Sequence, residues 1–200
     1  MSNATGAAQG RPRDTRRDAA ILDAALELLI DGGVEAVKVD VVAKRSGVSR
    51  GTVYRRHPTH SALVVDAVAH CYRSIILMEA LEEPTVDEMV EGISLALAEP
   101  RGRRLLRRLV SIPRDHPKLF AQLRGAVGTP DREKTIRQVL ARAAAQHRFC
   151  ADTDLEMVQT LFSAAMVAHL FTEPDDVTVA DVRDHLFQVL RALGYRKDTR

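Results

Sequence analysis

The chain has 200 residues, 46% of them hydrophobic and 28% charged, and its formal net charge is +2. This balance is typical of a soluble globular protein with a sizeable core, and no apolar run approaches the roughly 20 residues of a membrane span. The N-terminus has no apolar signal core, so a cytoplasmic protein is expected. Cys71 and Cys150 are isolated in a long chain and are expected to be reduced thiols.

The N-terminal third contains three predicted helices behind a polar tail. Residues 1–12 are small and polar and predict a disordered tail. The first helix is amphipathic and ends at Gly32 and Gly33; its apolar residues at helical spacing are Ile21, Ala24, Ala25, Leu28 and Leu29. A second helix is expected over 39–46, a turn over 47–49 and a third helix over 50–57, which Pro58 ends.

The rest of the chain predicts further helices. A long apolar helix is expected over 61–81, and the cluster of Glu82, Glu83 and Pro84 then marks a domain boundary. Later helices are expected over 85–98, 101–112, 116–126, 131–147, 153–172 and 178–193, with breakers at Pro100, Pro113, Pro117, Gly128, Pro130 and Pro174. No segment alternates as a strand would. The sequence therefore predicts an all-α protein: a tail at 1–12, a three-helix domain at 13–60, a linking helix at 61–83 and a C-terminal helical-bundle domain at 84–200.

The second and third predicted helices have the pattern of a helix-turn-helix. Such a motif needs a small residue where its helices cross, a glycine able to adopt a left-handed turn, and apolar residues that hold the helices together. Ala43 supplies the small residue and Gly47 the turn, while Ser49 is placed to cap the following helix. The apolar positions are Val42, Val48 and Val53.

Positive charge is concentrated around this motif. Residues 38–60 contain a single acid, Asp40, and six bases, an excess of +5 within 23 residues: Lys38, Lys44, Arg45, Arg50, Arg55 and Arg56. A basic run on a helix is often only a solvated face. Because this run coincides with the helix-turn-helix spacing, it predicts DNA binding.

The third helix turns a polar face away from its buried valine. At about 100° per residue, Gly51 and Arg55 lie nearly opposite that valine, with Thr52 and Tyr54 beside them. Gly51 would bring the backbone close to DNA, and Arg55 can make a bidentate contact to guanine. The hydroxyls of Thr52 and Tyr54 suit phosphates or thymine edges, although Tyr54 could equally serve packing. Arg50 lies in the first turn, where recognition helices meet base edges.

The segment from Gly47 to Leu63, GVSRGTVYRRHPTHSAL, resembles the signature of the tetracycline-repressor (TetR) family, and the similarity extends over residues 17–70. The resemblance implies that bases are read by Arg50, Gly51 and Thr52, with Arg55 joining them or contacting phosphate. It assigns the DNA backbone to Tyr54, Arg56 and His60. The predicted DNA-binding set is therefore Lys38, Ser49, Arg50, Gly51, Thr52, Tyr54, Arg55, Arg56 and His60.

Three positions depart from the family pattern. His57 stands where the family has Phe, which makes the anchor of the third helix looser or more polar. His60 replaces a phosphate-binding Lys, so its phosphate contact would weaken above a pH of about 6.5, the value of a free imidazole. Lys38 and Val39 replace the Thr or Ser that caps the second helix, so neither that cap nor its phosphate contact follows from the pattern.

Other functions find less support. A second basic cluster comprises Arg101, Arg103, Arg104, Arg107 and Arg108, and its helical spacing favours a solvated face over an anion pocket or an accessory DNA contact. His57 and His60 have no nearby ligands to complete a metal site. Because no phosphate loop, nucleophile elbow or zinc spacing is present, neither a cofactor nor catalysis is expected. The alternative to duplex binding is a helical adaptor or RNA-binding protein that uses the same basic face.

For the second domain, the resemblance implies a helical bundle that holds a small effector, forms a homodimer and releases a repressor from its DNA. Candidate effector-lining residues, although Met and Phe more often fill plain core, are Met78, Met89, Phe120, Phe162 and Met166. A two-fold dimer would hold its recognition helices about one DNA turn, roughly 34 to 36 Å, apart or a multiple of it, and would read a near-palindromic operator. The identities of the effector and the operator do not follow from the sequence.

The helices expected over 153–172 and 178–193 carry more apolar surface than a terminal hairpin needs, which predicts the dimer interface. One apolar stripe consists of Leu155, Val158, Phe162, Ala165, Met166 and His169. The other consists of Val182, Leu186, Val189, Leu190 and Leu193. The residues left outside both stripes, and so available to a partner, are Leu161, Ala164, Ala168 and Phe187.

Overall fold

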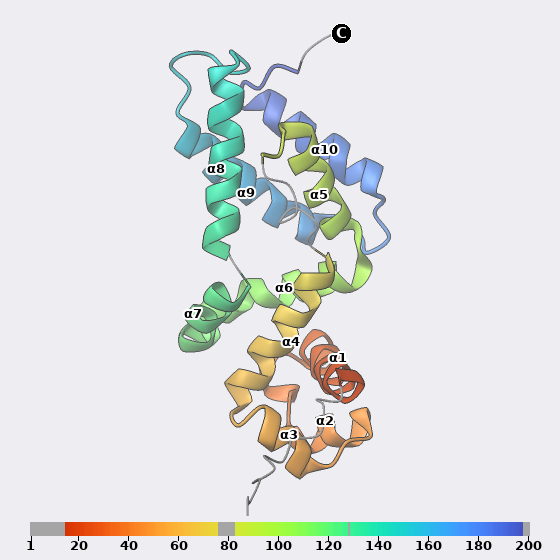
Figure 1. The fold of residues 1–200 in the computed structure, drawn as a ribbon. Helices are drawn as coiled ribbons and strands as arrows, with labels where there is room; N and C mark the ends of the chain where they lie inside the picture. The colour runs from red at the N-terminus through yellow and green to blue at the C-terminus, as the bar shows by residue number, and fades with distance from the viewer. Residues whose placement is uncertain (1–14, 76–82, 128, 198–200) are drawn as a thin grey trace, which may run out of the picture.

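In a computed structural model, the described residues (15–75, 83–127 and 129–197) form α helices and one 3-10 turn, with no strand among them, so the predicted all-α fold is confirmed. The elements are α1 (Thr15–Gly32), η1 (Val34–Ala36), α2 (Val39–Ser46), α3 (Arg50–Arg56), α4 (His60–Ile75), α5 (Val86–Ala98), α6 (Pro100–Asp115), α7 (Pro117–Ala126), α8 (Thr129–Ala145), α9 (Leu155–Thr172) and α10 (Val179–Ala192). Helices α1 to α4 form one body and α5, α8, α9 and α10 a second, with α6 and α7 between them (Figure 1). The predicted tail and the end of the helix expected over 61–81 lie outside the described residues.

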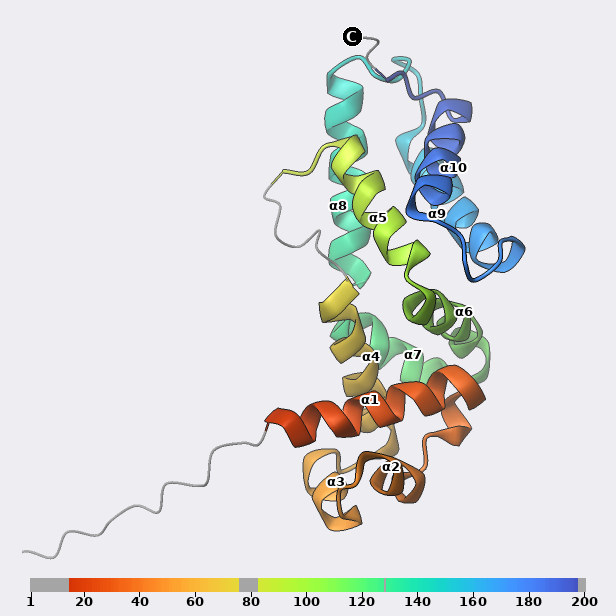
Figure 2. The same cartoon turned by 90° about the vertical axis from the view of Figure 1, so that its right-hand side faces the viewer.

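The helix-turn-helix forms as the sequence predicts. α1 lies across α4, and α2 and α3 lie beneath them (Figure 2). Gly47 has a φ of 67° and ends α2 in the left-handed conformation, which only glycine adopts without strain. Ser49 caps α3 by accepting a hydrogen bond from the Thr52 backbone N–H. Val53 is fully buried, which fixes the direction in which the opposite face of α3 points.

The first core joins the N-terminal body to α6 and α7. Its centre is formed by α1, α2, α3 and α4, whose fully buried members include Ile21, Val42, Val53 and Leu63. Leu105 and Ile112 of α6 and Leu119 and Leu123 of α7 pack into the same core. The two bodies therefore meet through shared helices as well as through the chain that links them.

The second core lies among α5, α8, α9 and α10. Its fully buried residues include Met89, Leu140, Phe162, Leu186 and Leu190. Capping boxes begin two of these helices, Thr85 with Glu88 at α5 and Thr178 with Asp181 at α10. The threonine hydrogen bonds lower the pKa of Glu88 and of Asp181 below their ordinary values.

Pro100 separates two helices as the sequence predicts, whereas the break predicted at Pro113 is wrong. Pro100 occupies the first turn of α6, and Pro113 lies inside a helix that continues to Asp115. A proline in the first turn loses no helical hydrogen bond, because that N–H has no partner in any helix. Beyond Pro113 the helix continues because Ile112 is buried in the first core and accepts the closing hydrogen bond from the His116 backbone.

The solvated basic face that the sequence favours on α6 forms only in part, because Arg104 is exposed but three other arginines are bound to backbone carbonyls. Arg103 is fully buried, Arg107 donates to the Leu170 carbonyl of α9, and Arg108 donates to the Ile30 carbonyl of α1. These acceptors are the carbonyl ends of helices that are distant in sequence. Helical spacing alone therefore could not distinguish arginines that bind distant carbonyls from arginines that face only solvent.

Candidate nucleic-acid interface

The outer face of α3 carries a connected row of polar side chains. Ser49 Oγ lies 2.9 Å from Thr52 Oγ1, and Arg55 Nη2 donates to the same Thr52 oxygen at 3.5 Å. Tyr54 lies beside this row and is 51% exposed. The row faces solvent at the end of the molecule that α2 and α3 form, so its hydroxyls and guanidinium are available to a partner.

Arg50 begins this row at the first turn of α3. Its Nε lies 2.6 Å from Asp40 Oδ1 of α2, and both side chains are more than half exposed. An exposed ion pair contributes about 0–1 kcal/mol, so a phosphate or a base edge can compete with Asp40 for the guanidinium. The pair thus holds Arg50 over the surface without closing it off.

Gly51 leaves a gap in the same surface. A Cβ built at this position meets no other atom within 4 Å. The chain therefore does not need glycine there for its own packing. A partner that approaches the backbone closely would explain the absence of a side chain.

Two other predicted residues, and the departure at His57, are tied to the protein itself. Arg56 forms an ion pair with Asp18 of α1. His57 is 7% exposed, and its Nδ1 donates to Asp66 Oδ2 of α4 at 2.8 Å, which makes the anchor of α3 polar. His60 Nε2 donates to the Val34 carbonyl at 3.1 Å. The contacts of Arg56 and His57 hold α3 against α1 and α4, and that of His60 holds the start of α4 against η1. Any phosphate contact of Arg56 or His60 has to be shared with these partners.

Lys38 completes the predicted set from the start of α2. It is exposed at the N-cap position, and its side chain makes no capping hydrogen bond. The family-typical cap of α2 is thus missing here. Lys38 can offer its charge but not the capping hydroxyl that the family usually supplies.

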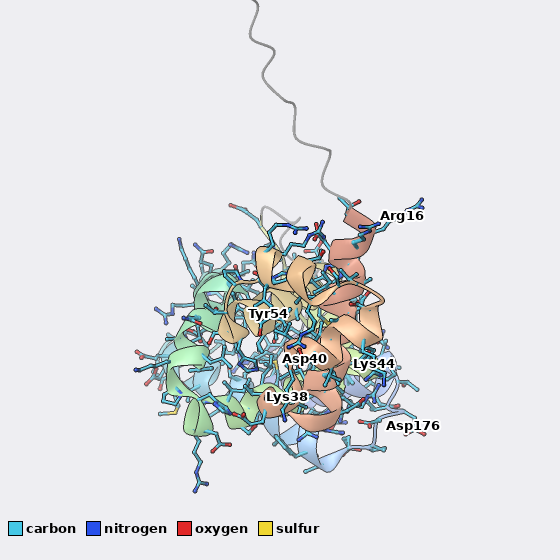
Figure 3. All side chains as sticks on the ribbon, turned by 90° about the horizontal axis from the view of Figure 1, so that it is seen from below. Arg16, Lys38, Asp40, Lys44, Tyr54 and Asp176 are labelled. Atoms are coloured by element: carbon cyan, nitrogen blue, oxygen red, sulfur yellow. The ribbon has the colours of Figure 1, made fainter. Side chains whose placement is uncertain are left out.

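Two arginines that the sequence reasoning left out of the site lie beside it. A cavity of about 360 Å³ opens between the first turn of α1 and the turn before α3, lined by Arg16, Arg17, Ala20, Ser46, Gly47, Val48, Ser49 and Thr52. Seen from below, Arg16, Lys38, Lys44 and Tyr54 lie on this end of the molecule (Figure 3). The run of arginines that leads into the first helix was the signal that could have identified them.

Three of the predicted effector-lining residues share one core, and Phe120 does not. Met89 and Phe162 are fully buried in the second core, and Met166 packs against it in part. Phe120 instead packs against the first core, with the guanidinium of Arg124 5.9 Å from its ring centroid. Met78 lies outside the described residues. Phe120 therefore does not share a site with the others.

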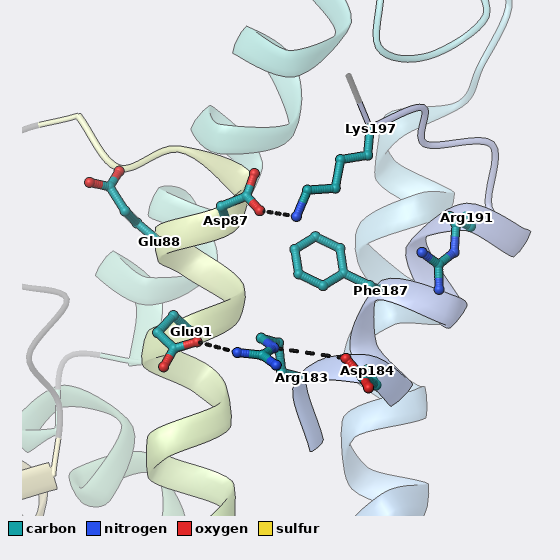
Figure 4. A pocket seen from close by; sticks show the side chains of 8 residues that line it. All are labelled: Asp87, Glu88, Glu91, Arg183, Asp184, Phe187, Arg191 and Lys197. Carbon is teal, nitrogen blue, oxygen red and sulfur yellow. Dashed lines mark hydrogen bonds and ion pairs between the residues drawn. The ribbon is translucent and has the colours of Figure 1, made fainter. Parts of the chain in front are cut away.

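A surface groove lies elsewhere on the second body, between α5 and α10. Its volume is about 580 Å³, and it is lined by Asp87, Glu88, Glu91, Arg183, Asp184, Phe187, Arg191 and Lys197 (Figure 4). Lys197 is ion-paired with Asp87 and lies 4.2 Å from the Phe187 ring centroid, while Arg183 lies near Glu91 and Asp184. The acids and bases of this groove largely neutralise one another, and none of the predicted effector-lining residues borders it.

Comparison with known proteins connects both bodies to one family. Residues 21–67 match the family model described as "Bacterial regulatory proteins, tetR family", and residues 85–189 match the one described as "Tetracyclin repressor-like, C-terminal domain". The uncharacterized HTH-type transcriptional regulator YdeS of Bacillus subtilis is 24% identical and is aligned over 92% of this chain and 93% of its own. The HTH-type transcriptional repressor KstR of Rhodococcus jostii is 46% identical over 28% of this chain and 26% of its own.

A solved structure shows the same fold. The fatty acid degradation regulator FadR from Bacillus halodurans superposes with a TM-score of 0.72 at 15% identity, covering 93% of this chain and 100% of its own. At that identity the likeness concerns the fold alone. It spans the helix-turn-helix body and the bundle together.

Proposed function

The chain belongs to the TetR family of DNA-binding transcriptional regulators, and we propose that it is a repressor that a small-molecule effector releases from its operator. The observation that carries this proposal is the exposed face of α3, where Arg50, Thr52, Tyr54 and Arg55 surround the open position at Gly51. The name of the KstR relative supports repression. The proposed division of the chain keeps the DNA-binding domain at 13–60, the linking helix at 61–83 and the effector and dimerisation domain at 84–200.

Arg55 is proposed to read a base, and His60 to contact phosphate. Arg55 lies on the free face of α3, whereas His60 lies just after it and is partly engaged by the Val34 carbonyl. Arg55→Ala should weaken binding to the preferred duplex by about 1–3 kcal/mol and broaden the sequence preference. His60→Ala should weaken all duplexes alike and by less, because its ring is shared with the protein.

The measurement is selection of bound sequences from random duplex DNA, followed by affinity titration of wild type and both variants. Lys118→Ala, an exposed base on α7 away from α3, is the matched control for loss of one positive charge and should leave affinity and preference unchanged. Unchanged affinity and unchanged base preference in Arg55→Ala would contradict the assignment.

TetR-family regulators act as dimers, and we propose that this chain pairs through α9. Five exposed residues of α9 form a stripe that is symmetric about Ala164: Met157, Leu161, Ala164, Val167 and Phe171. The four large members are 40% to 58% exposed. A large apolar stripe open to solvent marks an interaction surface. Among the described residues α9 is also the only helix long and apolar enough to cross a membrane, and burial of this stripe in a dimer accounts for that composition.

The symmetry of the stripe specifies how two copies would meet. In an antiparallel two-fold pair, the same patch faces itself. Met157 of one protomer would then contact Phe171 of the other, Leu161 would contact Val167, and the small Ala164 would lie at the axis, where the helices come closest. Small residues permit such a close approach.

α10 contributes less than the sequence suggested. Val182, Leu186 and Leu190 are fully buried within the protomer, and Phe187 is 7% exposed. Phe187 is therefore a core residue and not surplus surface, because α10 packs on α5. The interface proposed over 153–172 and 178–193 thus draws its apolar surface from the first of these segments, with α10 at its border.

A small effector is proposed to enter the second body, where α5, α8 and α9 surround Met89, Phe162 and Met166. Apolar helices of this kind can enclose a ligand. Coupling between the sites must be reciprocal, so an effector that lowers operator affinity 100-fold binds about 100-fold more weakly to the DNA-bound protein. Calorimetric titration of a thermal-shift hit into free and operator-bound protein measures this, and equal affinities would exclude that ligand as an inducer.

A further inference from the structure

Arginines of α6 donate hydrogen bonds to the carbonyl groups at the carboxyl end of α9. Arg103 is fully buried, and its Nη2 donates to the carbonyl oxygens of His169 at 2.7 Å and Glu173 at 3.0 Å. Arg107 Nη2 donates to the same Glu173 carbonyl at 3.0 Å. The last carbonyls of a helix have no partner within it and carry partial negative charge, so two guanidinium groups stabilise this end.

The same helix also holds the end of α1 in the DNA-binding body. Arg108 donates to the carbonyls of Ile30 and Asp31 at 2.8 Å and 2.9 Å. One turn before the buried core residues of α6, Arg101 Nε lies 2.8 Å from Glu27 of α1. α6 is thus fastened to α9 on one side and to α1 on the other.

His169 is the group in this junction that can change its charge. Its side chain is 3% exposed, and its Nδ1 lies 3.4 Å from Arg103 Nη1. Because a guanidinium has only donors, Nδ1 must accept this hydrogen bond, and His169 is then the neutral imidazole. A proton on Nδ1 would place a donor against a donor.

Burial, His185 and Arg103 oppose the charged form of His169 more than the nearby carboxylates favour it. His185 of α10 lies 4.7 Å away between ring centroids, and its buried Nε2 has no partner among the described residues. Arg103 and Arg107 of α6 share one carboxylate, Asp175, at 4.0 Å and 2.5 Å. The other charged groups facing it are Glu173 and Asp181. Burial, and then His185 and Arg103, lower the pKa of His169 below its ordinary value.

We propose that this junction is a proton-sensitive clasp, in which neutral His169 keeps Arg103 seated on the carboxyl end of α9 and protonation of His169 releases it. Because Arg108 of the same helix holds α1, release loosens the link between the dimer helix and the DNA-binding body. Only the loosening of the link to the DNA-binding body rests on the proposed function. The contact of His169 and Arg103 at the end of α9 is a property of the fold.

The direction of the pH effect follows from the lowered pKa. An unfolded histidine binds its proton near pH ~6.5, whereas folded His169 resists protonation until the pH is lower. Between those values the unfolded state binds more protons, so stability falls as the pH falls through this window. One such histidine raises the unfolding constant by up to about tenfold per pH unit.

The test compares urea unfolding of wild type and His169→Asn at a pH of about 7.5 and of about 5.5. Asn places an acceptor oxygen near the position of Nδ1 but cannot be protonated. The wild-type unfolding constant should rise about tenfold more on acidification than that of His169→Asn. His147→Asn, which changes an exposed histidine of the same body, is the matched control and should keep the wild-type pH dependence. If the unfolding constants of His169→Asn and His147→Asn depended equally on pH, the clasp would be overturned.

An NMR titration of wild-type histidines covers the case in which His169→Asn does not fold. The His169 ring should titrate below the pH of ~6.5 at which an unfolded histidine does, and titration at or above that pH would overturn the proposal. The effect of the clasp on DNA binding is tested by measuring duplex affinity for His60→Gln and for the double variant His60→Gln with His169→Asn. Acidification should weaken duplex binding by the single variant but not by the double variant. Identical pH profiles would overturn the link to DNA, whereas no duplex binding at any pH would count against the proposed function and leave the unfolding test intact.

Discussion

The two arginine clusters of this protein have similar sequences and opposite environments. On α3, Arg50 and Arg55 are exposed, and their nearest partners are a solvated Asp40 and a threonine hydroxyl. On α6, Arg103 is fully buried, and both of its Nη atoms donate to backbone carbonyls. A guanidinium that remains open can bind a ligand, while one whose donors are used holds the fold together. The partners of an arginine, not its neighbours in sequence, decide between these roles.

The largest expected effect is that of removing the buried guanidinium. Arg103→Ala leaves the carbonyl oxygens of Leu97, His169 and Glu173 without this donor, and hydrogen bonds to charged groups contribute about 1.5–3 kcal/mol each. Urea unfolding should show a loss of about 3 kcal/mol or more.

Arg104→Ala is the matched control, because Arg104 is the exposed neighbour on the same helix. A substitution at such a position should change stability by no more than about 0.5 kcal/mol. Equal losses of stability in Arg103→Ala and Arg104→Ala would contradict the contrast between exposed arginines and arginines bound to backbone carbonyls.

The same contrast for apolar residues is tested on α9. Ala164→Asp places like charges together at the proposed two-fold axis, whereas Ala180→Asp adds a charge to an exposed alanine of α10 outside the stripe. Light scattering at micromolar concentration should show a dimer for wild type and Ala180→Asp, and a monomer for Ala164→Asp, because the charge is desolvated only at the axis. A monomeric wild type would contradict the dimer outright.

The smallest expected effect on stability is that of Gly51→Ala. Because a Cβ there meets nothing within 4 Å, Gly51→Ala should stabilise α3 by roughly 0.5–1 kcal/mol through helix propensity. The same methyl group should weaken duplex binding if the backbone approaches DNA. Thermal unfolding and duplex titration should therefore move in opposite directions, and a variant that binds DNA as tightly as wild type would show that the backbone stays at a distance.

The helix-turn-helix could be predicted from the sequence because its determinants are local. Gly47, Ser49 and Val53 act within a few residues of one another, and turn, cap and burial follow from their spacing. The departures at Lys38 and His57 were also visible, and the structure shows a missing cap and a polar anchor there.

What sequence reasoning missed depends on contacts between distant segments. Arg103 meets the end of α9 some 66 residues later, and Arg108 meets α1 some 78 residues earlier, so no periodicity could reveal either partner. Phe120 was grouped with the effector candidates as an apolar residue of the second domain, but α7 folds back onto the first core. Phe187 was predicted to be surplus surface for the same reason, since its burial depends on the packing of α10 on α5.

The exposed arginines of α3 and the proposed pairing through α9 together predict a dimer that binds duplex DNA sequence-specifically. Selection of wild-type protein on random duplex DNA tests it most directly. The enriched sequence should be a near-palindrome whose half-sites lie about one helical turn, roughly 10 base pairs, apart or a multiple of it. Enrichment of no duplex sequence, or tighter binding to single-stranded RNA of matched length, would contradict it.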